Sequence, residues 1–140
     1  MPTTPRDIFG LAERLCKEGK DEVTLRSALS RAYYAALLES EATFEQVQRF
    51  DQESSHAVVI NSVVAYSRGA NPGREDARVI AQSLPKMRRL RNDADYHLEL
   101  VCTAAQAESV LTRALDVLDR CDNIRTRRAA AAAAMAPPPT

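Results

Sequence analysis

SRAYYAALLES at residues 30–40 and RLRNDADYHL at residues 89–98 are the two stretches that determine the fold class of this chain. The first is rich in alanine and carries two adjacent tyrosines, a pattern typical of a helix that packs closely against its neighbours. The second ends a long segment in which apolar or small residues recur at alternating steps of 3 and 4 from Ala77 onward. Arg91 is the polar exception in that stripe. Both stretches therefore predict helices, and the second one carries the candidate chemistry.

Helical periodicity continues outward over almost the whole chain, and the alternating β-branched runs of strands are missing. The patterns predict helices over 5–18, from Asp21 into the forties, from Ser54 or Ser55 to just before Gly69, over 74–98, and from Thr103 onward. The acidic segment 39–53 is less periodic, so we expect the second helix to fray or bend there. Pro85 predicts either a kink in the fourth helix or two helices that meet at this point. The fold class is therefore all-α.

The last twelve residues differ in composition from the rest of the chain. The alanine run 129–134 can continue the last helix, because alanine is the best helix former, whereas the prolines at 137–139 cannot. We predict a single helical domain over 1–128 and an Ala/Pro-rich flexible tail over 129–140.

The composition bounds the function. The chain has 140 residues, with 19 Lys and Arg and 19 Asp and Glu, so its net charge is zero. This balance argues against a protein that binds nucleic acid non-specifically over its whole surface, but it allows a local basic site.

The three cysteines, Cys16, Cys102 and Cys121, are odd in number and widely spaced. This predicts reduced core residues, with neither a disulfide nor a metal site. We expect no cofactor. No apolar run approaches the roughly 18 residues of a membrane helix, and no signal peptide is evident, so a cytoplasmic protein is expected.

Arg91 is the residue from which a site can be built. An arginine in an apolar stripe must be paired or line a polar cleft, and Asp95 lies at the i+4 position. Asp93 stands at the same spacing from His97 and is expected to fix the orientation of that ring. Arg91 and His97 are six residues apart, about 240° of rotation beyond one full turn, so they do not share a helix face. A site that uses both requires the helix to end near Tyr96 or a second subunit to contribute, which favours a composite cleft at a homodimer interface.

These residue types suit metal-free cleavage of RNA. His97 would move the protons of the ribose 2′-OH and the leaving oxygen, Arg91 would stabilise the phosphorane charge, and Asn92 would supply a neutral donor. Asp93, Asp95 and Tyr96 would support this site. The residues expected to attract the RNA backbone are Lys86, Arg88 and Arg89, and those of a possible opposite wall are Arg26, Ser30 and Tyr34. A structural ion pair, an incidental histidine, a solvated basic face and core-packing tyrosines remain the alternatives for the same residues.

At these residues the chain resembles the HEPN superfamily of higher eukaryote and prokaryote nucleotide-binding domains. The resemblance covers residues 5–122 and rests on SRAYYAAL, SSHAVVINSVV and LRNDADY with the helix that follows. Arg91, Asn92 and His97 match the family signature of an arginine, a polar residue and a histidine. The resemblance implies an up-and-down bundle of four to five helices that forms a homodimer.

The resemblance also implies a function. In active members, Arg and His residues from two protomers form a metal-independent endoribonuclease cleft, often in a toxin–antitoxin or phage-defence protein. The implied partners are an RNA substrate and a minimal nucleotidyltransferase or another antitoxin-like protein, with no membrane involved. The alternative is a non-catalytic HEPN-like module that binds a nucleotide or a partner. A third possibility is a structural helical protein that docks on another chain through its last helix and alanine-rich tail.

Overall fold

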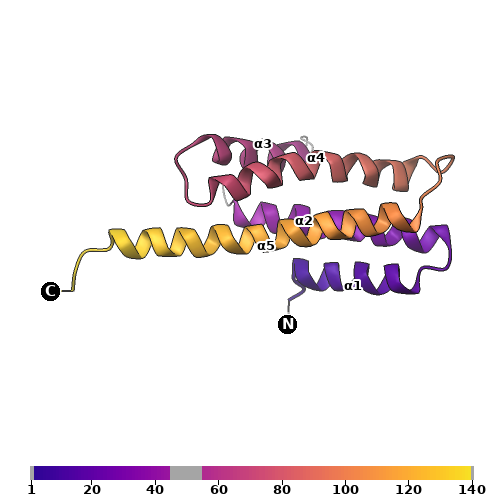
Figure 1. Ribbon diagram of the computed structural model, residues 1–140, viewed down its shortest axis with the longest axis horizontal. Coiled ribbons are helices and arrows are strands. Elements are labelled where there is room, and N and C mark those ends of the chain that lie inside the picture. The colour runs from indigo at the N-terminus through magenta and orange to yellow at the C-terminus, as the bar shows by residue number, and fades with distance from the viewer. Residues whose placement is uncertain (1, 45–54, 140) are drawn as a thin grey trace.

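The computed structural model describes residues 2–44 and 55–139, and within these residues it contains five α-helices and no strand (Figure 1). The helices are α1 (Pro5–Glu18), α2 (Glu22–Thr43), α3 (Ser55–Arg68), α4 (Arg74–Tyr96) and α5 (Ala104–Met135). The predicted all-α bundle is confirmed. Helix α2 runs into the forties as predicted and ends at Thr43, and most of the segment 39–53 in which fraying or bending was expected falls on 45–54, outside the described residues.

Capping side chains explain where the helices begin. Thr4 accepts a hydrogen bond from the Asp7 amide, and the Asp7 side chain accepts one from the Thr4 amide, which forms a capping box before α1. Thr103 and Gln106 form the same reciprocal pair before α5. Asp21 caps α2 by accepting from the amide of the third helical residue. The three predicted helix starts are confirmed. They were predictable because each cap involves residues that are close together in the sequence.

Helix α4 differs from its prediction at two points. It passes through Pro85 as one helix, so the alternative of two helices is wrong. It ends at Tyr96 and not at the expected 98, because the chain turns at His97, whose backbone has φ −113° and ψ 75°. At the other end, Gly73 adopts φ 73° and lies so close to α5 that a Cβ would stand 2.9 Å from Ile124.

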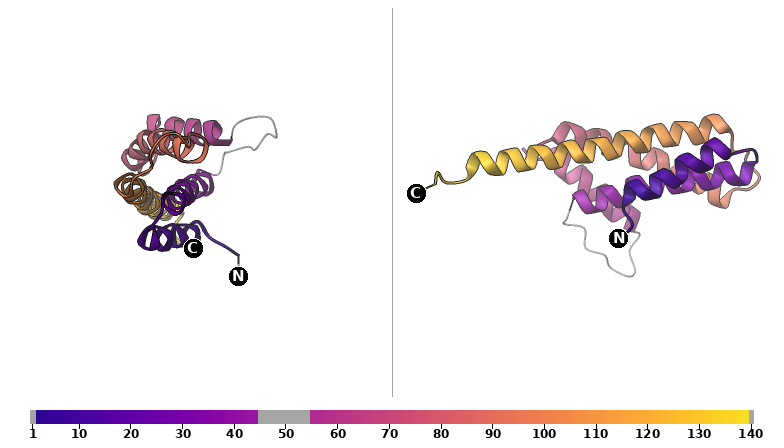
Figure 2. Two further views of the ribbon diagram at one scale, coloured as in Figure 1. Left: turned by 90° about the vertical axis from the view of Figure 1, so that its right-hand side faces the viewer. Right: turned by 90° about the horizontal axis from the view of Figure 1, so that it is seen from below.

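The helices stack in layers, which Figure 2 shows end-on. Helices α3 and α4 form one outer layer, α2 and α5 lie in the middle, and α1 covers the opposite side. Helix α2 packs at the centre because its alanines at 28, 32, 35 and 36 are fully buried. Tyr33 contacts His56 near the start of α3, and Phe44 contacts Tyr66 near its end, so α2 and α3 run in the same direction. The other successive helices are antiparallel.

Helix α5 extends beyond the rest of the bundle (Figure 1). Its last buried residue is Ile124, and the helix continues through the alanine run to Met135. The expected continuation through the alanines is confirmed, whereas flexibility of 129–140 stays a prediction. No helix within the described residues is both long and apolar enough to cross a membrane.

Candidate functional site

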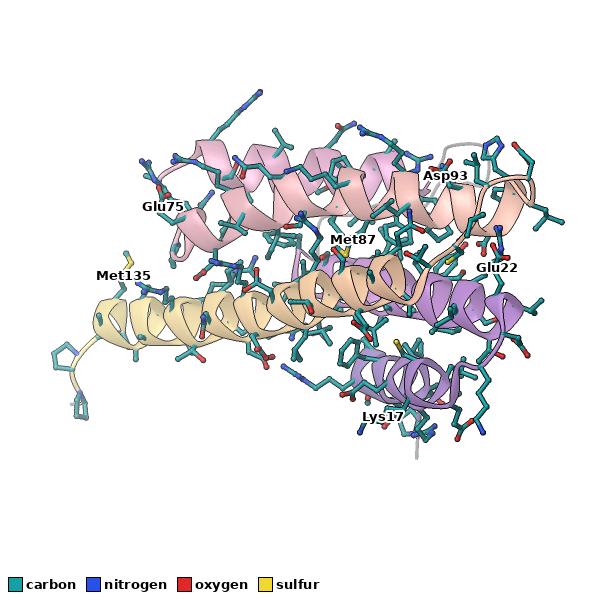
Figure 3. All side chains as sticks on the ribbon, turned by 45° about the vertical axis from the view of Figure 1, so that its right-hand side comes forward. Lys17, Glu22, Glu75, Met87, Asp93 and Met135 are labelled. Carbon is teal, nitrogen blue, oxygen red and sulfur yellow. The ribbon has the colours of Figure 1, made fainter. Side chains whose placement is uncertain are left out.

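Arg91 lies on the buried face of α4 and is only 4% exposed. Its Nη1 lies 3.6 Å from Oδ2 of Asp95, the partner predicted from the i+4 spacing. The Ser30 hydroxyl of α2 donates to the same carboxylate oxygen at 3.0 Å. Met87, one turn before Arg91, is fully buried and points from α4 toward α5 in Figure 3. The guanidinium is therefore held inside the bundle by its own helix and by α2.

Three tyrosine rings surround the Arg91 guanidinium. Its central carbon lies 5.4 Å from the ring centroid of Tyr33, 5.2 Å from that of Tyr34 and 5.7 Å from that of Tyr96. Each distance is within the range of a cation–π interaction. The Nε of Arg91 has no hydrogen-bond partner among the described residues. We call Arg91 and these three residues the tyrosine cage.

His56 completes this cluster, and the sequence interpretation missed it as a site residue. Its Nδ1 lies 2.8 Å from the Tyr33 hydroxyl, and the two rings stack with a centroid separation of 5.6 Å and an interplanar angle of 3°. Tyr34 meets the same imidazole edge-on at 6.0 Å. The sequence did contain a signal for it. His56 lies three residues before Val59, and Val63 follows four residues later; both valines are buried, so this spacing places His56 on the inward face of α3.

Burial and positive charge set the protonation states in this cluster. Burial lowers the pKa of His56 below its ordinary 6.5, and the charges of Arg91 and Arg88 lower it further. Burial raises the pKa of Tyr33 to about 12, although the two arginines act in the opposite direction. Near neutral pH, His56 is therefore uncharged, and the Tyr33 hydroxyl donates to its Nδ1.

His97 lies outside the tyrosine cage. It is the first residue after α4, and 51% of its side chain is exposed. Its Nδ1 is 3.3 Å from Oε1 of Glu99, whereas Asp93 contributes only a backbone carbonyl, which accepts from the His97 amide at 3.0 Å. The expectation that Asp93 orients the ring is therefore wrong, because the chain leaves the helix at His97 and the ring lies against Glu99 instead. Helix α4 does end at Tyr96, but no hydrogen bond joins Arg91 to His97 within the described residues.

Arg26, which was expected to line the wall of the cleft, instead has a structural role. It is 8% exposed and donates to the carbonyl oxygen of Ala94 at 2.8 Å and to that of Leu100. It also pairs with Glu22 at 2.9 Å, and Glu22 accepts the Cys102 amide at 2.6 Å. These contacts, which we call the Arg26 clasp, satisfy carbonyls at the end of α4 and fix the turn into α5. Ser30 and Tyr34, the other two residues of the expected wall, do lie against Asp95 and Arg91.

The other predicted site residues are divided between two environments. Lys86 and Arg89 are exposed on the outer side of α4, whereas Arg88 is half-buried and lies near enough to His56 to affect its pKa. Asn92 is also half-buried. The structure therefore brings Arg91, Asp95, Ser30 and Tyr34 together, and it leaves the exposed lysine and arginine at a different surface.

The described residues contain no group of three His, Cys, Asp or Glu side chains placed to hold a metal ion. Comparison of the chain with protein-family models, with curated proteins and with solved structures finds no match. The function must therefore be inferred from the geometry of the chain itself.

Proposed function

We propose that this protein is a helical binding module of the HEPN type and that Arg91 and His97 of one subunit do not form a catalytic pair. The observation that carries the proposal is the enclosure of Arg91, which is 4% exposed and has Asp95 and three tyrosine rings around it. An arginine that stabilises a phosphoryl transition state must direct its N–H groups at the ligand. Here its own subunit occupies that space.

The energetics support the same conclusion. Each cation–π contact is worth about 0.5–1 kcal/mol, and the partly exposed ion pair with Asp95 adds to them, so moving the guanidinium into solvent costs roughly 3 kcal/mol. A cost of that size limits the released form to about one molecule in a hundred, because 1.4 kcal/mol corresponds to a factor of ten. A binding function of the module does not require this release.

A metal-independent endoribonuclease is the second candidate. The feature that favours it is Tyr96, whose side chain covers Arg91 and is 70% exposed, and which directly precedes the half-exposed His97. Displacement of this one ring, on formation of a homodimer, would open a path between the two residues and create the composite cleft. A toxin or defence role and an antitoxin-like partner such as a minimal nucleotidyltransferase belong to this candidate.

The homodimer is part of both candidates and has its own support. Val23, Tyr96, Leu98, Leu100 and Val101 expose large apolar side chains, and the Arg26 clasp brings these segments together at one end of the bundle. We call this surface the apolar end.

The charged side chains beside the apolar end are of both signs. Lys20 contributes a cation, and Asp21 and Glu99 contribute carboxylates. A two-fold axis can therefore place opposite charges against each other, which favours a second copy of the chain over a partner of one charge.

Incubation of the purified protein with total RNA in EDTA distinguishes the two functions. The binding module predicts RNA of unchanged length with the wild type and with His97→Ala. The ribonuclease predicts fragments with 2′,3′-cyclic phosphate ends that are produced by the wild type and lost in both His97→Ala and Arg91→Lys. Circular dichroism of each variant verifies that it is folded.

A further inference from the structure

The charges of this neutral chain are unevenly distributed between its layers. Helices α3 and α4 together carry seven Lys and Arg residues but only four carboxylates. No carboxylate lies between Asp76 and Asp93, although this stretch holds five cations. The outer layer formed by α3 and α4 is therefore basic, and the excess of carboxylates lies in the remainder of the chain.

The exposed cations of α4 follow one side of the helix. Arg74, Arg78 and Lys86 are exposed on this side, with the exposed Gln82 midway between Arg78 and Lys86 at i+4 steps. Arg89 follows three residues after Lys86. The row spans about 22 Å, since an α-helix rises 1.5 Å per residue. Because α3 and α4 form an outer layer of the bundle, this row faces solvent (Figure 2).

A hollow of about 420 Å³ lies beside the row, between α3 and the first half of α4. Arg68, Arg74 and Arg78 line it. Glu75 is the carboxylate nearby, 3.1 Å from Arg78 and 3.8 Å from Arg74, and about half or more of each of these side chains is exposed. Exposed pairs of this kind hold their partners weakly, so the arginines remain available to another anion. We call the row and this hollow the basic face.

We infer that the basic face binds the phosphate backbone of a nucleic-acid strand. This inference rests on the proposed binding function and names its ligand. A row of cations without stacking aromatics matches a linear polyanion and contacts phosphates without reading bases.

The distribution of apolar side chains distinguishes a nucleic acid from an acidic protein. Stable protein interfaces have an apolar core, whereas phosphate contacts need none. Among the described residues, α3 and the part of α4 before Tyr96 expose no large hydrophobic side chain. The exposed hydrophobics lie elsewhere, mainly at the apolar end. The basic face thus has the composition of a phosphate-binding surface.

Fluorescence anisotropy with a labelled 20-nucleotide oligouridylate, at low salt in EDTA, tests the inference on the full chain. The test variant is Arg78→Glu/Lys86→Glu. Its matched control is Arg14→Glu/Lys17→Glu, which makes the same charge change at exposed positions of α1, on the opposite side of the bundle. We expect the test variant to weaken binding at least 10-fold and the control less than 2-fold. With Arg78→Gln/Lys86→Gln, the slope of log K against log salt should become shallower by about 1.4, since each phosphate contact on a single strand contributes about 0.7.

Three results would overturn the inference: no binding by the wild type at low salt, equal losses in the test and control variants, or displacement of the RNA by polyglutamate at lower concentration than by unlabelled oligouridylate. The last result would assign the basic face to an acidic protein. A denaturing gel of the same samples separates this inference from the proposed function. If the RNA is cleaved and the test variant still binds it more weakly than the control does, the non-catalytic module is contradicted, whereas RNA binding by the basic face is supported.

Discussion

Arg91 keeps its charge inside the bundle because Asp95 and three tyrosine rings replace the water that it loses on folding. His97, only six residues later, stands half in solvent beside an exposed glutamate. One side chain thus contributes to the stability of the fold, and the other is free to contact a ligand. The two residues should respond very differently to truncation.

We expect Arg91→Ala to lower the free energy of unfolding by about 3 kcal/mol, because it leaves a cavity beneath the tyrosine rings and removes the cation–π contacts and the pair with Asp95. His97→Ala should change it by less than about 0.5 kcal/mol, as is usual for exposed positions. Urea denaturation of the two variants beside the wild type measures both values. Similar small losses in both variants would show that the enclosure of Arg91 is not maintained in solution.

His56 predicts a pH dependence of stability. Burial lowers its pKa in the folded chain, so as the pH falls below 6.5 the unfolded chain binds a proton before the folded chain does. The free energy of unfolding should therefore be at its full value above pH 6.5 and decrease as the pH falls from 6.5 toward 5. Asp7, Asp21 and Glu22, whose pKa values are lowered from 3.8 or 4.5, act only at more acidic pH.

Denaturation midpoints between pH 8 and pH 5 measure this dependence. His56→Gln should flatten the profile in that range, whereas His97→Gln, at an exposed histidine, should leave its shape unchanged. A profile that is equally steep in the wild type and in His56→Gln would contradict the role of His56.

The sequence allowed the Arg91–Asp95 pair to be predicted, because both residues lie on one helix at a fixed spacing. It did not reveal His56 or the tyrosine cage, because these contacts join α2, α3 and α4 across long separations along the chain. The partner of His97 was also missed, since it depends on the backbone of the turn after α4.

The end of α4 and the start of α5 are held by a residue from another element. The Arg26 clasp reaches from α2 to the carbonyl oxygens of this turn, and Glu22 accepts an amide from its far end. Helix starts with local caps were predictable from sequence, whereas the end of α4 was misplaced by two residues because Arg26 is distant in the chain. The effect of Pro85 was also left open by the sequence, because the continuity of a helix through a proline depends on tertiary packing, and α4 packs against α3, α2 and α5.

Arg26→Lys should destabilise the bundle by about 2 kcal/mol, because a lysine keeps the charge but cannot bond several carbonyls at once. Hydrogen exchange should become faster at the Leu100 amide, which donates to the His97 carbonyl, and at the Cys102 amide, which donates to the Glu22 carboxylate. Arg31→Lys, at an exposed position of the same helix, is the matched control and should change neither quantity. Unchanged exchange in Arg26→Lys would show that the turn does not depend on the clasp.

At the scale of the whole molecule, two surfaces of different chemistry lie apart. The basic face covers the outer layer, and the apolar end is formed where α4 meets α5. The sequence showed a net charge of zero and a basic cluster at Lys86–Arg91. It could not show that Arg68 and Arg74 line the same surface, because this depends on how α3 packs against α4.

The apolar end predicts self-association. Leu98→Asp and Val101→Asp replace side chains that are 75% and 71% exposed in the single chain, so neither should disturb its fold. We expect the wild type to sediment as a dimer and each variant to shift toward monomer by at least 10-fold in dissociation constant. Leu11→Asp, a half-exposed position on α1, should leave the dimer intact. A wild type that remains monomeric at high concentration would contradict the homodimer.

The most direct test of the central claim, that this module binds RNA without cutting it, is one labelled RNA incubated with the wild type in EDTA and divided between a native and a denaturing gel. The predicted result is a retarded band on the native gel and full-length RNA on the denaturing gel. Shortened RNA with 2′,3′-cyclic phosphate ends, absent when His97→Ala replaces the wild type, would contradict the claim and establish the ribonuclease.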